Sequence, residues 1–116
     1  MYTESNKLLV VRLLRPVTHG TLVAMAEALP KVLANGGPKA VLADRRGQAF
    51  DADIAEGVDF GKKLGEKLKD TGVRIAVLNR PCRPVADVVH AQIHGAGVPL
   101  AQFEKEADAR MWLIGE

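Results

Sequence analysis

The stretch that decides the fold runs from residue 39 to residue 70: Lys39-Ala-Val-Leu-Ala-Asp44, then Arg45-Arg-Gly-Gln-Ala-Phe50, then a segment from Asp51 to Asp70. The first part is a short apolar run between turn signals, as is typical of a parallel strand buried on both faces. The second part is polar and predicts a turn. The third has helical spacing, with Asp51 as the expected N-cap and Gly72 as the expected left-handed stop. Together they predict a strand, a turn and a long helix, the repeating unit of an α/β fold.

One face of that helix carries both large apolar side chains and glycines. On a helical wheel it gathers Ile54, Val58, Leu64 and Leu68 together with Gly57, Gly61 and Gly65 at a spacing of four. Each glycine in a helix costs about 1 kcal/mol relative to alanine, so the stripe needs a reason. We favour close packing of the helix on the sheet. The alternative is a groove left open for an apolar ligand tail.

Composition sets the class of protein. The 116 residues are enough for one domain spanning 1–116, and 47% of them are hydrophobic. A net charge of +2, without a basic run longer than two residues, does not support nucleic-acid binding. The single cysteine, Cys82, excludes an internal disulfide and suits a reducing compartment. No apolar run approaches the roughly 20 residues of a membrane span, and no signal peptide is evident, so we expect a cytoplasmic protein.

Strands and helices alternate along the rest of the chain. We expect strands at 7–14, 39–44, 73–78 and 98–103, an antiparallel edge strand at 2–4, and helices at about 18–35, 51–70, 84–95 and 104–113. Pro30 is a misfit inside the first helix and predicts a kink there. Pro99 places the last strand at an edge. The pattern predicts a mostly parallel sheet of four or five strands, with 39–44 and 73–78 internal and helices on both faces.

The C-terminal stretch carries a family resemblance. Phe103-Glu-Lys-Glu-Ala-Asp-Ala109-Arg-Met-Trp112-Leu113 resembles the closing strand and helix of the SpoIIAA-like group of STAS-like domains. The resemblance extends over nearly the whole chain, through the early hairpin, the first helix led by threonine and the strand ending in Asp44. It implies a mixed sheet with four helices, and Trp112 and Leu113 packed on that sheet. The group is similar in fold to the CRAL-TRIO lipid carriers, which implies a binder of small molecules or lipids.

One departure from the wider STAS family concerns its phosphoserine switch. The anti-sigma antagonists of that family carry an Asp-Ser-Ser/Thr-Gly motif that opens the helix after the central strand. Here the corresponding segment, from Asp44 to Asp53, contains no hydroxyl side chain. We therefore expect no phosphoserine switch at this place.

Arginines gather in the turns that follow three predicted strands. The candidate ligand-binding residues are Arg15, Asp44, Arg45, Arg46, Arg80 and Arg83. In open α/β sheets ligands bind at the carboxyl ends of the strands, and guanidinium groups suit phosphate or carboxylate. This pattern predicts an anion site for a small molecule, an acidic lipid head or an acidic protein. The alternative is ordinary surface arginines paired with Asp44, Asp51 and Asp53.

Two further features are less specific signals of a chemical role. His90 and His94 lie one helical turn apart, a spacing that permits a metal. No third ligand is evident, so we expect two solvent-facing histidines on an ordinary helix. Cys82, between Arg80 and Arg83 before a helix, has an environment that favours thiolate, yet no base accompanies it.

The sequence therefore predicts a non-enzymatic STAS-like binding module that needs no cofactor. Its expected partner is a small anionic or lipid-like molecule, with a protein partner or a homodimer as alternatives. The alternative from another class is a small enzyme or metal-binding protein that uses Cys82 or the histidine pair.

Overall fold

The computed structural model describes residues 2–4, 8–12, 18–33, 38–44, 53–78 and 84–114, with the backbone alone at 2–4 and 84–87. Five strands in these segments form one sheet in the order β1-β2-β3-β4-β5. Their bounds are Tyr2–Glu4, Leu8–Arg12, Ala40–Asp44, Arg74–Leu78 and Leu100–Phe103. The first strand pairs antiparallel with β2, and the other neighbours are parallel. The mostly parallel sheet, its internal strands β3 and β4 and its edge strands β1 and β5 are thereby confirmed.

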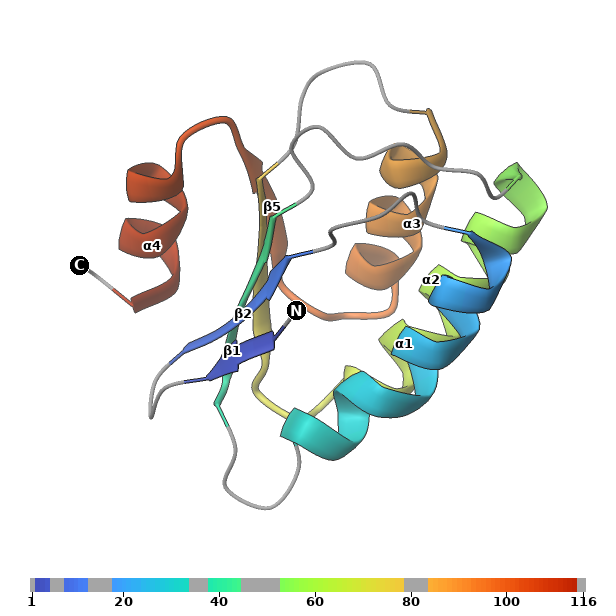
Figure 1. Ribbon diagram of the computed structural model, residues 1–116, viewed down its shortest axis with the longest axis horizontal. Coiled ribbons are helices and arrows are strands. Elements are labelled where there is room, and N and C mark those ends of the chain that lie inside the picture. Colours follow the sequence, from blue (N-terminus) through green and yellow to red (C-terminus); the bar gives the residue numbers. More distant parts are fainter. Residues whose placement is uncertain are drawn as a thin grey trace.

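The described helices form unequal layers on the two faces of the sheet. They are α1 (His19–Leu33), α2 (Ile54–Leu68), α3 (Pro84–Gly95) and α4 (Glu106–Ile114). Figure 1 shows α1, α2 and α3 on one face and α4 alone on the other. Strand order follows chain order, so crossovers of one hand place all three connecting helices on the same face. The last helix follows β5 and covers the opposite face.

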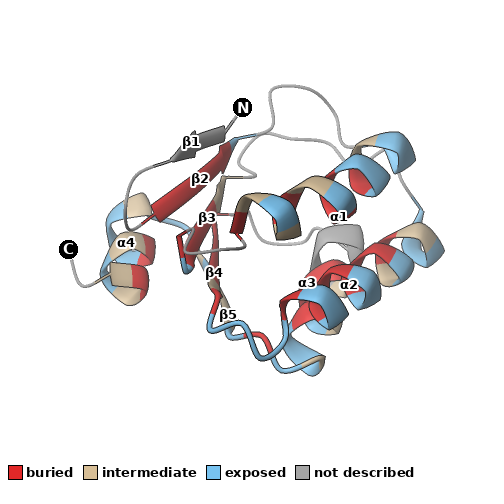
Figure 2. Ribbon diagram, turned by 90° about the horizontal axis from the view of Figure 1, so that it is seen from below, coloured by how far each residue is buried: buried red, intermediate tan, exposed pale blue. Residues whose placement is uncertain are grey.

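The alternating side chains of the strands supply two cores. Figure 2 shows in red the buried residues of the strands and the buried faces of the helices. The larger core joins Leu9, Val11, Val41, Ile75 and Val77 to buried side chains of α1, α2 and α3. The smaller joins Leu8, Val10, Ala40, Leu42, Ala76 and Leu78 to Ala109 and Leu113 of α4. The described helices include none that is long and apolar enough to cross a membrane.

Packing of α4 follows the prediction for the C-terminal stretch. Leu113 is buried, and Trp112 packs against the smaller core. The Trp112 ring lies 5.9 Å from the Phe103 ring, and the guanidinium carbon of Arg74 lies 4.2 Å from its centroid. An arginine over an indole face adds a cation–π attraction to apolar contact. Met111, the neighbouring residue, is 60% exposed.

Capping side chains fix where α1 and α2 begin. The amide of Thr21 donates to Thr18 Oγ1 over 3.3 Å, so Thr18 caps α1. Asp53, and not Asp51, caps α2: its carboxylate accepts from the Glu56 amide over 2.8 Å, and Glu56 Oε1 accepts from the Asp53 amide over 2.9 Å. The reciprocal pair depends on a glutamate three residues after the cap, which Asp53 has and Asp51 lacks.

One side chain of α2 was assigned to the wrong face. Ile54, expected on the buried face, is 54% exposed because it belongs to the first turn, beside the N-cap. Phe60, which lies four residues before Leu64 and eight before Leu68, is buried in the core instead. The turn after α2 is as expected, with Gly72 in the left-handed region at φ 82°.

Candidate functional site

The predicted arginine site belongs to the carboxyl edge of the sheet. Strand register aligns Arg12 with Asp44 and Asp44 with Leu78, so β2, β3 and β4 end side by side. Of the candidate residues, Asp44 is described. Arg15, Arg45, Arg46, Arg80 and Arg83 lie outside the described residues. The sheet order has no reversal within these strands, so the strand-order switch that marks ligand crevices in many open α/β sheets is not present among them.

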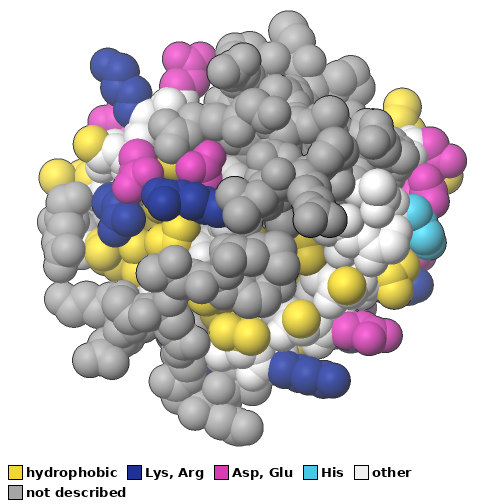
Figure 3. Space-filling view, viewed as in Figure 1, with side chains coloured by type: hydrophobic (Ala, Val, Ile, Leu, Met, Phe, Trp, Pro, Cys, Tyr) yellow, Lys and Arg dark blue, Asp and Glu magenta, His cyan; other side chains and the backbone are white. Residues whose placement is uncertain are grey.

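Asp44 points toward the α4 layer, on the same face of the sheet as Leu42. Its Oδ2 lies 3.4 Å from Nε of Arg12, and Nη2 of Arg12 lies 3.3 Å from Glu106 on α4. Glu106 in turn contacts Nε of Arg110 over 2.9 Å. The Asp44 carboxylate is therefore already paired with Arg12, a strand residue that was not among the predicted site residues. Figure 3 shows acidic and basic side chains lying beside one another on the side of α4.

The other carboxylates expected near the arginines differ in their roles. Asp53 is occupied by the α2 N-terminus, as described above. Asp51 lies outside the described residues. An anion-binding role for the arginines is thus neither supported nor opposed by these aspartates, and it stays a proposal.

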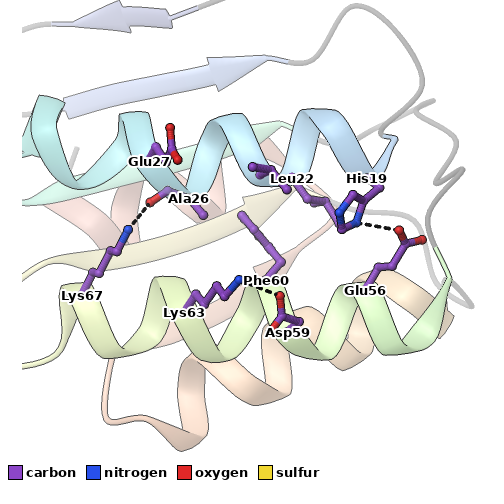
Figure 4. A pocket seen from close by; sticks show the side chains of 10 residues that line it. His19, Leu22, Ala26, Glu27, Glu56, Asp59, Phe60, Lys63 and Lys67 are labelled. Atoms are coloured by element: carbon purple, nitrogen blue, oxygen red, sulfur yellow. Dashed lines mark hydrogen bonds and ion pairs between the residues drawn. The ribbon is translucent and has the colours of Figure 1, made fainter.

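A groove of about 340 Å³ lies between α1 and α2. The two helices run side by side in the same direction, and Figure 4 shows the side chains between them. The lining comprises His19, Leu22, Val23, Ala26 and Glu27 of α1, and Glu56, Asp59, Phe60, Lys63 and Lys67 of α2. Sequence reasoning missed this groove because it depends on how two amphipathic helices pack against each other.

The floor of the groove is apolar and its rim is charged. Leu22, Ala26 and Phe60 are at most 5% exposed, whereas Val23 stands 46% exposed beside them. Lys63 pairs with Asp59 along the rim, with Nζ 3.0 Å from Oδ2. A concave apolar surface with a few polar groups is the general form of a small-molecule site. Phe60 could have been identified from its spacing of four with Leu64 and Leu68.

Two contacts tie α1 to α2 at the ends of the groove, and we call them the end contacts (Figure 4). At the N-terminal end, His19 Nδ1 lies 2.6 Å from Glu56 Oε2. Glu56 is also the residue that closes the α2 capping box, so the helix start and the groove end share one side chain. At the other end, Lys67 Nζ donates to the backbone carbonyl of Ala26 over 3.2 Å.

Two glycines of the stripe, Gly61 and Gly65, face α3 and not the sheet or the groove. A Cβ atom added at Gly61 would lie 2.7 Å from Gln92 Cβ, and one added at Gly65 would lie 2.7 Å from Ala96 Cβ. The glycines therefore permit close contact between two helices of one layer. The close packing that we expected against the sheet is found against α3 instead. No groove opens at Gly61 or Gly65.

The histidine pair does not have the environment that we expected. His90 is only 3% exposed and lines the core beneath α3, while His94 is exposed. The expectation of two solvent-facing histidines is therefore wrong for His90, because this turn of α3 packs toward the sheet. No group of three His, Cys, Asp or Glu that could hold a metal occurs in the described part of the chain. Cys82 lies outside the described residues.

Comparison with solved structures identifies the architecture. The anti-sigma factor antagonist SpoIIAA in its unphosphorylated form matches with a TM-score of 0.62 at 17% identity, over 98% of this chain and 100% of that one. The fold is SpoIIAA-like. SpoIIAA in the phosphorylated form, described as a Bacillus cell fate determinant, matches with a TM-score of 0.59 at 15% identity, over 94% and 96% of the two chains. No family model matches the sequence, and comparison with curated proteins gives no significant match.

These matches confirm the STAS-like, SpoIIAA-like fold that the C-terminal motif predicted. Identities of 15–17% show a shared fold, and one fold serves many functions.

Proposed function

We propose that this chain is a non-enzymatic binding module whose ligand is a small amphiphile with an anionic head group. The observation that carries the proposal is the α1–α2 groove, with its apolar floor and charged rim. Its volume of about 340 Å³ falls at the lower end of the range for small-molecule sites. An apolar tail lying over Leu22 and Phe60 would cover Val23, which is now 46% exposed to water.

The head group is assigned to the arginine-rich edge. The segments that carry Arg15, Arg45 and Arg46 connect β2 to α1 and β3 to α2, so both lead into the N-terminal end of the groove. By their position in the chain these arginines are the partners that we propose for the head group of a ligand whose tail lies in the groove, because guanidinium groups suit phosphate or carboxylate. Arg80 and Arg83 precede α3 and would extend the same basic edge.

A thermal-shift titration with decanoate and with inorganic phosphate tests the proposal. Decanoate should raise the melting temperature in a saturable way, as binding linkage requires. Val23→Ser should weaken the decanoate response, and Met111→Ser, at an exposed site on α4, is the matched control. Exchanging Arg45 and Arg46 for Gln should remove the saturable response to both anions and leave the general salting-out effect.

The outcomes of this titration distinguish the anion site at the sheet edge from the apolar groove. A phosphate response without any effect of Val23→Ser would leave an anion site at the edge and remove the groove from it. Identical responses of parent and all variants would overturn the small-ligand function. Native mass spectrometry of freshly purified protein provides an independent test through a co-purified small molecule.

A protein partner is the second candidate, favoured by the whole-chain likeness to an anti-sigma factor antagonist. The segment from Asp44 to Asp53 lacks a hydroxyl side chain, so a partner would have to be regulated without phosphoserine there. Failure of every small probe, together with a defined complex that Val23→Ser weakens and Met111→Ser does not, would favour this candidate.

A further inference from the structure

Pro30 leaves one carbonyl group of α1 without its usual donor. The helix runs from His19 to Leu33 and contains Pro30 three residues before its end. Proline has no backbone N–H, so the carbonyl four residues earlier, at Ala26, cannot accept the ordinary helical hydrogen bond. Buried carbonyl groups in folded proteins nearly always find another partner. Ala26 is only 5% exposed, so water has limited access to this region.

The missing donor is replaced from the neighbouring helix. Lys67 extends from the last turn of α2, and its Nζ donates to the Ala26 carbonyl oxygen over 3.2 Å (Figure 4). The proline ring also crowds the carbonyl four residues before it, which favours a tilt of that group away from the helix axis. A tilted carbonyl is easier for a donor outside the helix to reach.

We propose that Lys67 is the substitute donor for the amide proton that Pro30 lacks, and that this bond fixes the separation of α1 and α2 at its end of the groove. Lys67 is thus a positioning residue, acting through the Ala26 carbonyl. The pair explains how a proline is tolerated inside a continuous helix. It stands independently of what the groove binds.

Lys63 provides the matched control on the same helix. It also lines the groove, but it pairs with Asp59 of its own helix and not with α1. Replacing Lys63 removes a lysine from the same rim without touching the carbonyl of Ala26. Any general effect of losing one positive charge should therefore occur equally in Lys63→Met and Lys67→Met.

A double-mutant cycle with Pro30→Ala tests the assignment. In the parent, Lys67→Met should raise the equilibrium constant for unfolding by roughly three- to tenfold, the size expected for one partly exposed hydrogen bond. In the Pro30→Ala background, the Ala26 carbonyl regains a helical donor, so the effect of Lys67→Met should fall to that of Lys63→Met. The coupling between positions 30 and 67 is the measured quantity.

Two further readouts distinguish this bond from packing of the lysine stem. Lys67→Arg keeps a charged donor and should retain most of the coupling, and Lys67→Met should shift the carbonyl ¹³C resonance of Ala26 more than Lys63→Met does. Equal costs of Lys67→Met in the parent and in the Pro30→Ala variant would overturn the proposal. So would an Ala26 carbonyl resonance that responds alike to both methionine variants.

Discussion

On the α3 side of α2, a Cβ atom added at Gly61 would come within 2.7 Å of Gln92 Cβ, whereas on the α1 side the same helix borders a groove of about 340 Å³. The two interfaces lie in one layer over one sheet, so the sheet does not cause the difference. Residue size does: glycines line the side toward α3, and Phe60, Lys63 and Lys67 line the side toward α1. Where a helix has glycines on one face, no side chain keeps its neighbour away, so the two helices pack closely.

The difference between the α2–α3 and α1–α2 interfaces gives this small domain a concave surface without a larger core. The close contact with α3 anchors α2, and the end contacts, His19–Glu56 and Lys67–Ala26, connect it to α1 through polar groups. Between those contacts, Leu22 and Phe60 remain in the core while Val23 is left 46% exposed. Added side-chain volume should therefore destabilise the protein on the α3 side of α2 and have almost no effect on the α1 side.

The largest expected effect is that of Gly61→Leu. The added side chain would meet Gln92 Cβ at 2.7 Å and the Val89 carbonyl oxygen at 2.9 Å, both closer than real contacts allow. Overpacking of this kind should lower the free energy of unfolding by roughly 2–3 kcal/mol or more, despite better helix propensity. Urea unfolding with an unchanged m value would measure it. Val23→Leu, on the groove side, is the control and should stay within about 0.5 kcal/mol of the parent.

Gly65→Ala should have a smaller effect of the same sign. Its Cβ would lie 2.7 Å from Ala96 Cβ, so α2 and α3 must separate slightly. We expect a net loss of about 1 kcal/mol even though alanine favours a helix by a similar amount. Gly20→Ala is the matched helical control, because the nearest neighbour of its added Cβ is Thr18 Oγ1 at 3.7 Å. This variant should be more stable than the parent. If both variants changed the free energy of unfolding in the same direction in one urea series, a steric role for Gly65 would be contradicted.

Removing the α2 cap should cost about 1 kcal/mol. Asp53→Ala deletes the acceptor for the Glu56 amide and keeps the backbone N–H at residue 53 that donates to Glu56 Oε1, so one half of the capping box is lost. Asp53→Ser keeps a capping oxygen and should recover most of the loss. Thermal unfolding followed by circular dichroism would measure both variants. A cap variant as stable as the parent would mean that packing against α3 alone sets the start of α2.

The fold could be predicted because its signals are local. Short apolar runs and glycine or proline stops identified the strands, and the lack of polar alternation in 39–44 and 73–78 placed β3 and β4 inside the sheet, as observed. The tail from Phe103 to Leu113 predicted the SpoIIAA-like fold, which the structural matches confirm. Element ends shifted by a few residues because capping depends on pairs such as Asp53 and Glu56.

The candidate site was harder to predict because it depends on distant contacts. Helical spacing located the glycine stripe but not its partner α3, which is about thirty residues further along the chain. The groove depends on which faces of α1 and α2 meet, and the predicted buried face of α2 included Ile54 and omitted Phe60, which lines the groove. His90 was expected in solvent because a histidine carries no periodic signal of its own. The arginine edge stays a prediction.

The smallest effects should come from the surface ion pairs on α2. Lys63 Nζ lies 3.0 Å from Asp59 Oδ2 on the groove side, and Lys69 Nζ lies 2.9 Å from Glu66 Oε2 near the end of the helix. Both pairs are exposed, so solvent and salt screen them, and Lys63→Gln and Lys69→Gln should leave the urea midpoint unchanged within error at neutral pH.

The pH dependence of the Lys69 pair has a definite sign. The hydrogen bond to Glu66, with the charge of that carboxylate, raises the pKa of Lys69 above its ordinary value of 10.5. A raised pKa in the folded state means that the small stabilisation is complete below 10.5 and is lost as the pH rises through the folded value. Because the pair is exposed, parent and Lys69→Gln should unfold at the same urea midpoint at neutral pH and also above the folded pKa. A difference that grew as the pH rose would have the wrong sign for a raised lysine pKa. If either lysine variant shifted the neutral-pH midpoint as far as Gly65→Ala does, the two sides of α2 would differ by charge, and the steric account of the groove would fail.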